Sequence, residues 1–259
     1  FDTAIVLHPT LRLALLVFLA RIPIRVGTGY RLYSVLFNRR VFHHRKTGRR
    51  HELEYNLELA EKIGASLEKV EFKFFIPTSV QLRVEKLLTH LGIKPDDRVV
   101  ALHPGSGGSA RDWPLARFAE LNDRLVSELR VKTIVTAGPG EENLVATVIR
   151  QSRIQPPQWM GNLKELAALL KRANLLITNS TGPLHLAVAV GTEVIGFYCP
   201  IIPCLPSRWG PYGRPDSVLI PPLPPCKKCL NQNCAHYNCM DLIPVDEALA
   251  LAKKKLFGE

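Results

Sequence analysis

The chain has 259 residues, of which 46% are hydrophobic and 22% are charged, and this balance excludes a globally disordered protein. Its formal net charge of +11 favours anionic partners such as nucleotides, phosphorylated glycans, acidic lipids or nucleic acid. The length suits one large domain or two smaller ones.

The first 90 residues are predicted to form a short strand and three helices. The strand is expected at residues 4–7, and the helices at residues 11–20, 52–64 and 80–91. The apolar run 13–20 is shorter than the ~20 residues that span a bilayer, and the start of the chain has no signal-peptide pattern. We therefore expect a cytoplasmic protein that either stays in solution or contacts the inner membrane peripherally.

A basic stretch lies between the first two of these helices. Residues 39–51 are rich in Arg, Lys and His. The stretch either faces an anionic acceptor or membrane leaflet, or it forms a solvated charged loop. Binding to nucleic acid is permitted by the charge, but no recognised motif supports it, so no nucleic-acid partner is expected.

After residue 97, short apolar strands alternate with helices. The strands are expected at residues 99–102, 133–136, 175–178 and 194–198, and the helices at residues 114–129, 141–151, 163–172 and 183–190. This alternation predicts an α/β fold with a parallel sheet that helices cover on both faces. Prolines punctuate residues 77–95, and we place a boundary there that gives two domains, residues 1–90 and 91–259.

Ligands of such sheets bind beyond the carboxyl ends of the strands, and the first of these loops is rich in glycine. Residues 103–114 read HPGSGGSARDWP. Glycines expose backbone N–H groups, Ser106 and Ser109 add hydroxyl donors, and Arg111 adds a permanent charge that matches phosphate oxygens. The loop is a candidate phosphate site, with an ordinary surface loop as the alternative. Trp113 is expected in the core.

The second loop carries two adjacent carboxylates, Glu141 and Glu142. A carboxylate at this place can accept hydrogen bonds from both hydroxyls of a ribose. The alternative is that an acidic residue simply favours the start of a helix. No GxGxxG sequence follows a strand, which argues against a nicotinamide or flavin enzyme.

The third loop, residues 178–185, leads into a helix that Pro183 opens. Ser180 or Thr181 is expected to cap this helix. A helix start binds anions through its N–H groups, and His185 in the first turn is placed to face the same anion. The alternative is a well-capped helix with a partly buried histidine.

Four of the six cysteines form the pattern Cys226-x2-Cys229-x4-Cys234-x4-Cys239. This spacing suits a tetrahedral zinc site, with His236 as a substitute ligand. Buried free thiols or a disulfide pair are the alternatives, and we assign no metal and no cofactor to the chain.

In this order and spacing, the three loops resemble those of glycosyltransferase family 9, the ADP-heptose:lipopolysaccharide heptosyltransferases. Residues 177–187, ITNSTGPLHLA, are similar to the family signature TNDTGPxHLA. The HPGS sequence, with Arg111 and Trp113 after it, resembles the phosphate loop of the family. A cysteine-bearing tail before a final helix is also seen in many members.

The resemblance implies a GT-B architecture of two Rossmann-like domains, of which the N-terminal one is truncated here. It implies inverting transfer of a heptosyl group from ADP-heptose to a Kdo or heptose hydroxyl of the lipid A core, without a metal. Ser106 and Arg111 would bind the diphosphate, and Glu141 or Glu142 would hold the ribose. The remaining donor-binding residues would be Ser180, Thr181, Gly182 and His185 at the helix start.

Two departures from the family pattern affect this interpretation. Ser180 stands where the family has Asp, and the N-terminal Gly-Asp loop that supplies the expected general base has no counterpart in the chain. The catalytic residue is therefore unknown, and we expect a fragment that binds ADP but transfers no sugar. A transferase for another nucleotide sugar and a non-catalytic binding module are the alternatives.

Overall fold

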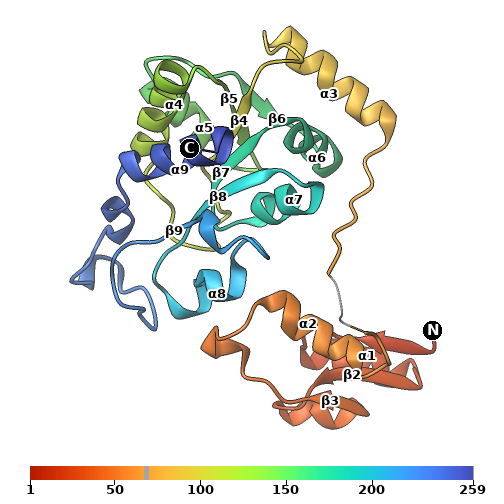
Figure 1. The fold of residues 1–259 in the computed structure, drawn as a ribbon. Coiled ribbons are helices and arrows are strands. Elements are labelled where there is room, and N and C mark those ends of the chain that lie inside the picture. The colour runs from red at the N-terminus through yellow and green to blue at the C-terminus, as the bar shows by residue number, and fades with distance from the viewer. Residues whose placement is uncertain (67–69, 259) are drawn as a thin grey trace. The chain divides into compact units, whose positions relative to one another are not determined.

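The computed structural model describes residues 1–66 and 70–258, and the chain divides into two compact units (Figure 1). The first unit is Phe1–Glu71 and the second is Phe72–Glu259. The division precedes the expected boundary at residue 90, because helix α3 (Thr78–His90) packs against helix α6 (Leu163–Arg172) of the second unit. No helix in the described part of the chain is long and apolar enough to cross a membrane.

The first unit is a small parallel sheet with helices. Its strands are β1 (Thr3–Ile5), β2 (Ile24–Thr28) and β3 (Arg39–Val41), in the order β1-β2-β3, and its helices are α1 (Leu11–Leu19) and α2 (Glu52–Glu61). Ala14 and Val17 of α1 pack in one apolar cluster, whereas Leu59 of α2 packs in another with Val26 and Val41. The sequence did not predict β2 and β3, since both are short and contain arginines.

The basic stretch is only partly a solvated loop. Its beginning is strand β3, and two of its arginines pair with acidic residues of α2. Arg45 bonds to Glu52, and Arg50 bonds to Glu58 and lies 3.5 Å from Glu54. Part of the positive charge is therefore neutralised within the first unit.

The second unit is built on a six-stranded parallel sheet with the strand order β6-β5-β4-β7-β8-β9. The strands are β4 (Val99–His103), β5 (Lys132–Ala137), β6 (Gln158–Met160), β7 (Leu175–Asn179), β8 (Glu193–Phe197) and β9 (Val218–Leu219). The first strand of this sheet along the chain is β4, and β5 and β6 follow it toward one edge. The chain then crosses back to β7, on the other side of β4, and continues through β8 to β9 at the other edge. This is the doubly wound order, and the reversal between β4 and β7 is its switch point.

Helices cover both faces of this sheet, as the alternating pattern predicted (Figure 1). One face carries α4 (Leu115–Leu129), α5 (Glu142–Gln151) and α9 (Val245–Phe257), and the other carries α3, α6 and α7 (Gly182–Val190). The predicted helix at residues 163–172 is confirmed as α6, whose start is closed by an Asn162–Glu165 capping box. The sequence missed β6, β9 and the short helix α8 (Pro206–Trp209).

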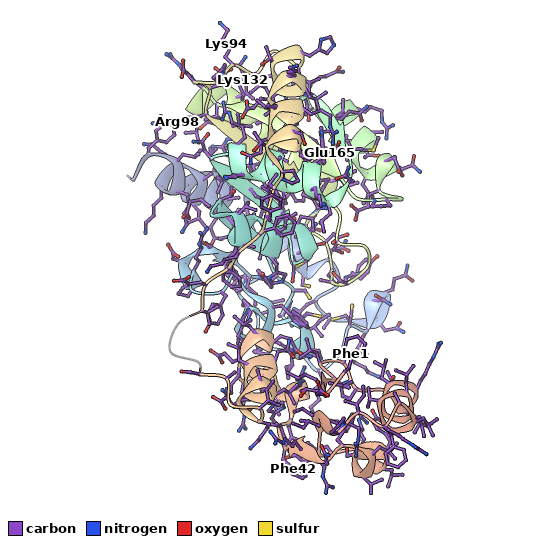
Figure 2. The ribbon with its side chains drawn as sticks, turned by 90° about the vertical axis from the view of Figure 1, so that its right-hand side faces the viewer. Phe1, Phe42, Lys94, Arg98, Lys132 and Glu165 are labelled. Atoms are coloured by element: carbon purple, nitrogen blue, oxygen red, sulfur yellow. The ribbon has the colours of Figure 1, made fainter. Side chains whose placement is uncertain are left out.

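The second unit carries positive charge at the amino-terminal edge of its sheet as well. Lys94, Arg98 and Lys132 lie at one end of the unit (Figure 2), at or just before the first residues of strands β4 and β5. The net charge of the chain therefore does not by itself locate an anion site, and the local geometry has to do so.

Candidate functional site

The candidate site lies at the switch point, where β4 and β7 run side by side. His103 at the end of β4 is in register with Thr178 near the end of β7. The glycine loop, residues 103–114, follows β4, and the start of α7 follows β7. Parallel doubly wound sheets bind ligands at this point, because the connections on either side of it leave the sheet in opposite directions.

Asn179 holds both ends of the glycine loop. Its Nδ2 donates to the Pro104 carbonyl oxygen at 2.6 Å, and its Oδ1 accepts from the Trp113 backbone N–H at 2.8 Å. Beside it, the Thr178 hydroxyl donates to the His103 carbonyl oxygen at 2.9 Å. These residues are buried, so the loop is anchored to the floor of the sheet by side chains of β7.

The middle of the glycine loop makes contacts of its own with the end of β7. The Ser109 hydroxyl lies 2.8 Å from the Ser106 carbonyl oxygen and 3.1 Å from that of Ser180. Gly107 and Gly108 have φ of 58° and 75°, the left-handed region that favours glycine. The predicted donor residues Ser106 and Ser180 are thus brought together.

Glu141 turns inward toward the glycine loop. One carboxylate oxygen accepts from the Gly107 N–H at 3.0 Å, and the other accepts from the Gly138 N–H at 2.8 Å and lies 3.3 Å from His103 Nε2. The hydrogen bond with His103 is the largest cause that lowers the pKa of Glu141 to about 2. Glu142, in contrast, is exposed, and its carboxylate accepts from the Gly140 N–H at 3.3 Å.

The Ser180 side chain is engaged with the protein. Its hydroxyl lies close to that of Tyr198, a buried residue whose pKa is raised mainly by that burial and lowered to a lesser degree by Ser180. The Tyr198 hydroxyl in turn donates to the Trp209 carbonyl oxygen at 2.8 Å. The Tyr198 hydroxyl therefore links the end of β8 to helix α8, with Ser180 beside it.

The start of α7 carries the other predicted donor residues. Thr181 occupies the N-cap position, one of the two places predicted, but its side chain accepts no capping hydrogen bond. A Cβ at Gly182 would meet no atom within 4 Å, so space is open at this turn. His185 is half-buried, with its ring 6.4 Å from that of Trp209.

Trp209 is a neighbour of the site that sequence reasoning missed. Its ring lies against His185, and the Arg208 guanidinium lies 5.0 Å from its centroid. A hydrogen bond of 3.0 Å from Nε1 to the Pro203 carbonyl oxygen fixes the indole. Trp209 lies in a segment rich in proline and glycine, where the sequence shows no helical or strand periodicity. Its position next to the site is therefore visible only in the folded structure.

Arg111 lies at the far end of the glycine loop, against the cysteine-rich segment, residues 226–239. Its guanidinium is 5.8 Å from the centroid of the Tyr237 ring. Trp113, two residues later, is buried as predicted and stacks on Phe197 with ring centroids 4.1 Å apart. Arg111 therefore shares the loop with Ser106, but its side chain is not hydrogen-bonded into the Glu141 and Asn179 contacts.

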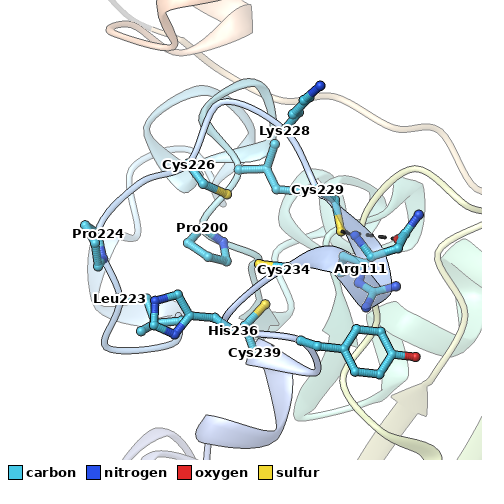
Figure 3. Close-up of a pocket in the computed structure, with 13 residues that line it drawn as sticks. Arg111, Pro200, Leu223, Pro224, Cys226, Lys228, Cys229, Cys234, His236 and Cys239 are labelled. Carbon is cyan, nitrogen blue, oxygen red and sulfur yellow. Dashed lines mark hydrogen bonds between the residues drawn. The ribbon is translucent and has the colours of Figure 1, made fainter.

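The cysteine-rich segment surrounds a small cavity of about 50 Å³ beside Arg111 (Figure 3). Cys226, Cys229, Cys234 and Cys239 line it, together with His236. All six cysteines are free thiols, and among the described residues no group of three or more His, Cys, Asp or Glu is arranged to hold a metal ion.

The two remaining cysteines lie against the glycine loop. The Cys204 sulfur is 3.9 Å from the Ser109 carbonyl oxygen. A hydrogen bond from Cys204 lowers the pKa of the buried Cys199 thiol below its usual value. The pattern of four cysteines in the sequence gave no hint of this second pair.

Comparison with known proteins gives one consistent result. The sequence pattern of glycosyltransferase family 9 (heptosyltransferase) matches residues 1–239. A Haemophilus influenzae protein named only as a glycosyltransferase is 31% identical over 238 residues, which are 87% of this chain and 66% of that protein. A lipooligosaccharide heptosyltransferase 2 from Campylobacter jejuni is 20% identical over 90% of this chain and 76% of its own length.

Solved structures show the same fold. A family 9 glycosyl transferase from Veillonella parvula superposes with a TM-score of 0.81 at 24% identity, covering 100% of this chain and 74% of that one. An E. coli ADP-heptose heptosyltransferase II gives 0.75 at 15% identity, covering 100% and 77%. An E. coli heptosyltransferase solved with ADP gives 0.67 at 18% identity, covering 98% and 73%. These likenesses confirm the α/β fold of the GT-B type.

Proposed function

Because the chain belongs to glycosyltransferase family 9, we propose that its second unit binds the diphosphate of a nucleotide sugar at the switch point between β4 and β7. The proposal depends on one observation: the glycine loop lies beside the amino-terminal end of α7, and hydrogen bonds from Asn179 and Ser109 hold the loop there. Backbone N–H groups at glycines and at a helix start are a recurrent way to bind phosphate.

The predicted donor residues take distinct places in this proposal. Ser106 and Arg111 contribute from the glycine loop, while Thr181, Gly182 and His185 contribute from the start of α7. The ribose hydroxyls are held by Glu141 or Glu142. The Glu141 oxygen that accepts from the Gly107 N–H keeps capacity for a second donor, so both carboxylates remain candidates. Ser180 contributes from the end of β7, beside the hydroxyl of Tyr198.

The proposed reaction is the inverting transfer of a heptosyl group from ADP-heptose to a Kdo or heptose of the lipopolysaccharide core. The heptosyltransferases among the similar proteins, and the neighbour solved with ADP, support this donor and acceptor. The arginine and the helix start would stabilise the negative charge of the leaving diphosphate. No general base is assigned in this chain, which spans 66% of its Haemophilus relative's length.

A direct test measures the binding of ADP, UDP and GDP to the purified chain by calorimetry. We expect ADP to bind best, and we expect Gly182→Ala to weaken it about tenfold or more while the melting temperature stays the same, because the new Cβ enters space that is open in the protein but needed by the phosphate. If the unaltered chain binds none of the three nucleotides, the proposal is wrong.

A donor other than ADP-heptose is the second candidate, and the inward Ser180 favours it, since no carboxylate stands there to orient sugar hydroxyls. Tighter binding of UDP or GDP than of ADP in the same experiment would establish this alternative. A non-catalytic binding fragment is a further candidate, because no general base is assigned in this chain. Measurable sugar transfer by the chain in an assay with ADP-heptose and a lipid A–Kdo acceptor would contradict it.

We also propose that the protein works at the cytoplasmic side of the inner membrane, where a lipid-linked acceptor would be reached by peripheral contact. The net charge of +11 supports attraction to an anionic surface. Flotation with vesicles that contain anionic phospholipid tests this, and binding that does not weaken with added salt would contradict the electrostatic account.

A further inference from the structure

The Glu141 carboxylate packs directly against the glycine loop, which binding a ribose would not by itself require. A Cβ built on Gly105 would lie 2.1 Å from one carboxylate oxygen of Glu141 and 2.6 Å from the other. Gly105 does not have a positive φ, so its backbone conformation does not demand glycine. What demands glycine is the approach of this carboxylate, which fits against the loop where any other residue would have a side chain.

We propose that Glu141 is a positioning residue that holds the glycine loop in the shape that receives the diphosphate, whether or not it also contacts the ribose. The inference rests on the proposed function for its ligand, but the contacts themselves lie entirely within the protein. The carboxylate joins Gly107 of the first loop to Gly138 of the second, across the neighbouring strands β4 and β5.

The charge of Glu141 would oppose an incoming phosphate unless the protein compensates it. The two backbone N–H groups do this in part, and His103 adds its ring nitrogen at 3.3 Å. His103 is itself held from its other side, with Nδ1 2.9 Å from the Thr136 hydroxyl, and both residues are buried. Both carboxylate oxygens thus have partners within the protein, on the buried side of a loop whose glycines 107 and 108 are exposed.

Glu141 has two candidate roles, binding the ribose and shaping the glycine loop, and a measurement of ADP affinity alone would not distinguish them. If Glu141 only binds ribose, its loss weakens ADP but leaves inorganic pyrophosphate unaffected. If it shapes the loop, its loss weakens both ligands by a similar factor. A glutamine in its place has one acceptor oxygen and one NH2 group, so it cannot accept from both Gly107 and Gly138.

The experiment compares the unaltered chain with Glu141→Gln and with the exposed neighbour Glu142→Gln, by titration with ADP and with pyrophosphate. We expect Glu141→Gln to weaken both ligands about tenfold, and Glu142→Gln to leave pyrophosphate binding unchanged. Unchanged pyrophosphate affinity in Glu141→Gln overturns the positioning role and leaves the proposed function intact.

A second measurement needs no ligand and separates the two proposals. Amide hydrogen exchange at Gly107 and Gly138 should be faster in Glu141→Gln, and the same as in the unaltered chain in Glu142→Gln. If the chain binds no nucleotide but these amides lose protection, only the proposed function fails. If their exchange does not change, the positioning role fails. Gly105→Ala should also destabilise the chain less when Glu141 is already alanine, since the side chain that it meets is then absent.

Discussion

The glycine loop, which contains Arg111, and the cysteine-rich segment, which Arg111 contacts, are both irregular in structure, but they are ordered in different ways. Buried side chains of β7 and the start of α5 hold the glycine loop along its length. The cysteine-rich segment is paired to the sheet region near its beginning, where Cys226 exchanges backbone hydrogen bonds of 2.8 Å with Pro200 and Ile202, and many of its side chains are exposed. The conformation of the glycine loop is therefore set by side chains from the sheet region, whereas that of the cysteine-rich segment is set by contacts at its ends.

The largest effect should come from the residue that anchors the glycine loop. Asn179→Ala leaves the Trp113 N–H and the Pro104 carbonyl without a buried partner, so we expect the free energy of unfolding to fall by about 2–4 kcal/mol. Chemical denaturation measures this. Asn143→Ala, at an exposed position of α5, is the control and should change stability by less than about 0.5 kcal/mol. Equal losses would contradict the anchoring role.

The next effect depends on pH. The folded protein lowers the pKa of Glu141 to about 2, so its contribution to stability is complete above the unfolded value near 4.5 and is lost as pH falls toward 2. We expect the unaltered chain to exceed Glu141→Gln by about 2 kcal/mol at pH 6, with the difference shrinking between pH 5 and pH 2. Thermal melting over this range tests the sign, and a difference that grows on acidification would refute it.

A smaller effect is expected where the two regions meet. Arg111→Ala removes a cation from the proposed phosphate site, so the affinity for ADP should fall about tenfold, or ~1.4 kcal/mol. Stability should change little, because the guanidinium contacts the ring of Tyr237 at a half-buried place. Arg150→Ala, on the exposed side of α5, serves as the control and should bind ADP as the unaltered chain does.

The smallest effect should come from the cysteine-rich segment. With Cys226, Cys229, Cys234 and Cys239 all changed to Ser, we expect a loss of stability below about 1 kcal/mol, since free thiols in a largely exposed segment bury little surface. Metal analysis of the purified chain should find no stoichiometric zinc. Stoichiometric zinc together with a collapse of stability on substitution would mean that the segment is organised by a metal after all.

Much of the second unit was predictable because its strands are buried and its helices have a regular apolar period. The strand at Val99–His103 and the helix at Leu163–Arg172 follow from these patterns directly. Strands β6 and β9 did not, because their two or three residues carry no period and their pairing comes from neighbours distant in the sequence. In the first unit, β2 and β3 were not predicted because their arginines interrupt the apolar pattern of a buried strand.

The candidate site was predictable in its residue types but not in their directions. The loops that hold Ser106, Glu141 and Thr181 lie at the same edge of the sheet, because they follow β4, β5 and β7, and β4 pairs with both of the other strands. The sequence did not reveal that Glu141 points into the glycine loop, or that Asn179 bonds to both of its ends. Such contacts depend on side-chain orientation at strand ends, and residue spacing along the chain does not contain that information.

The position of Ser180 beside the Tyr198 hydroxyl has a consequence for substitutions at position 180. An aspartate at position 180 would place a carboxylate next to a buried phenol whose hydroxyl already donates to the Trp209 carbonyl oxygen. We therefore expect an acidic residue at position 180 to occur together with a different residue at position 198, which would also change the contact with the Trp209 carbonyl oxygen. The two positions should covary as a pair when sequences near this one are aligned.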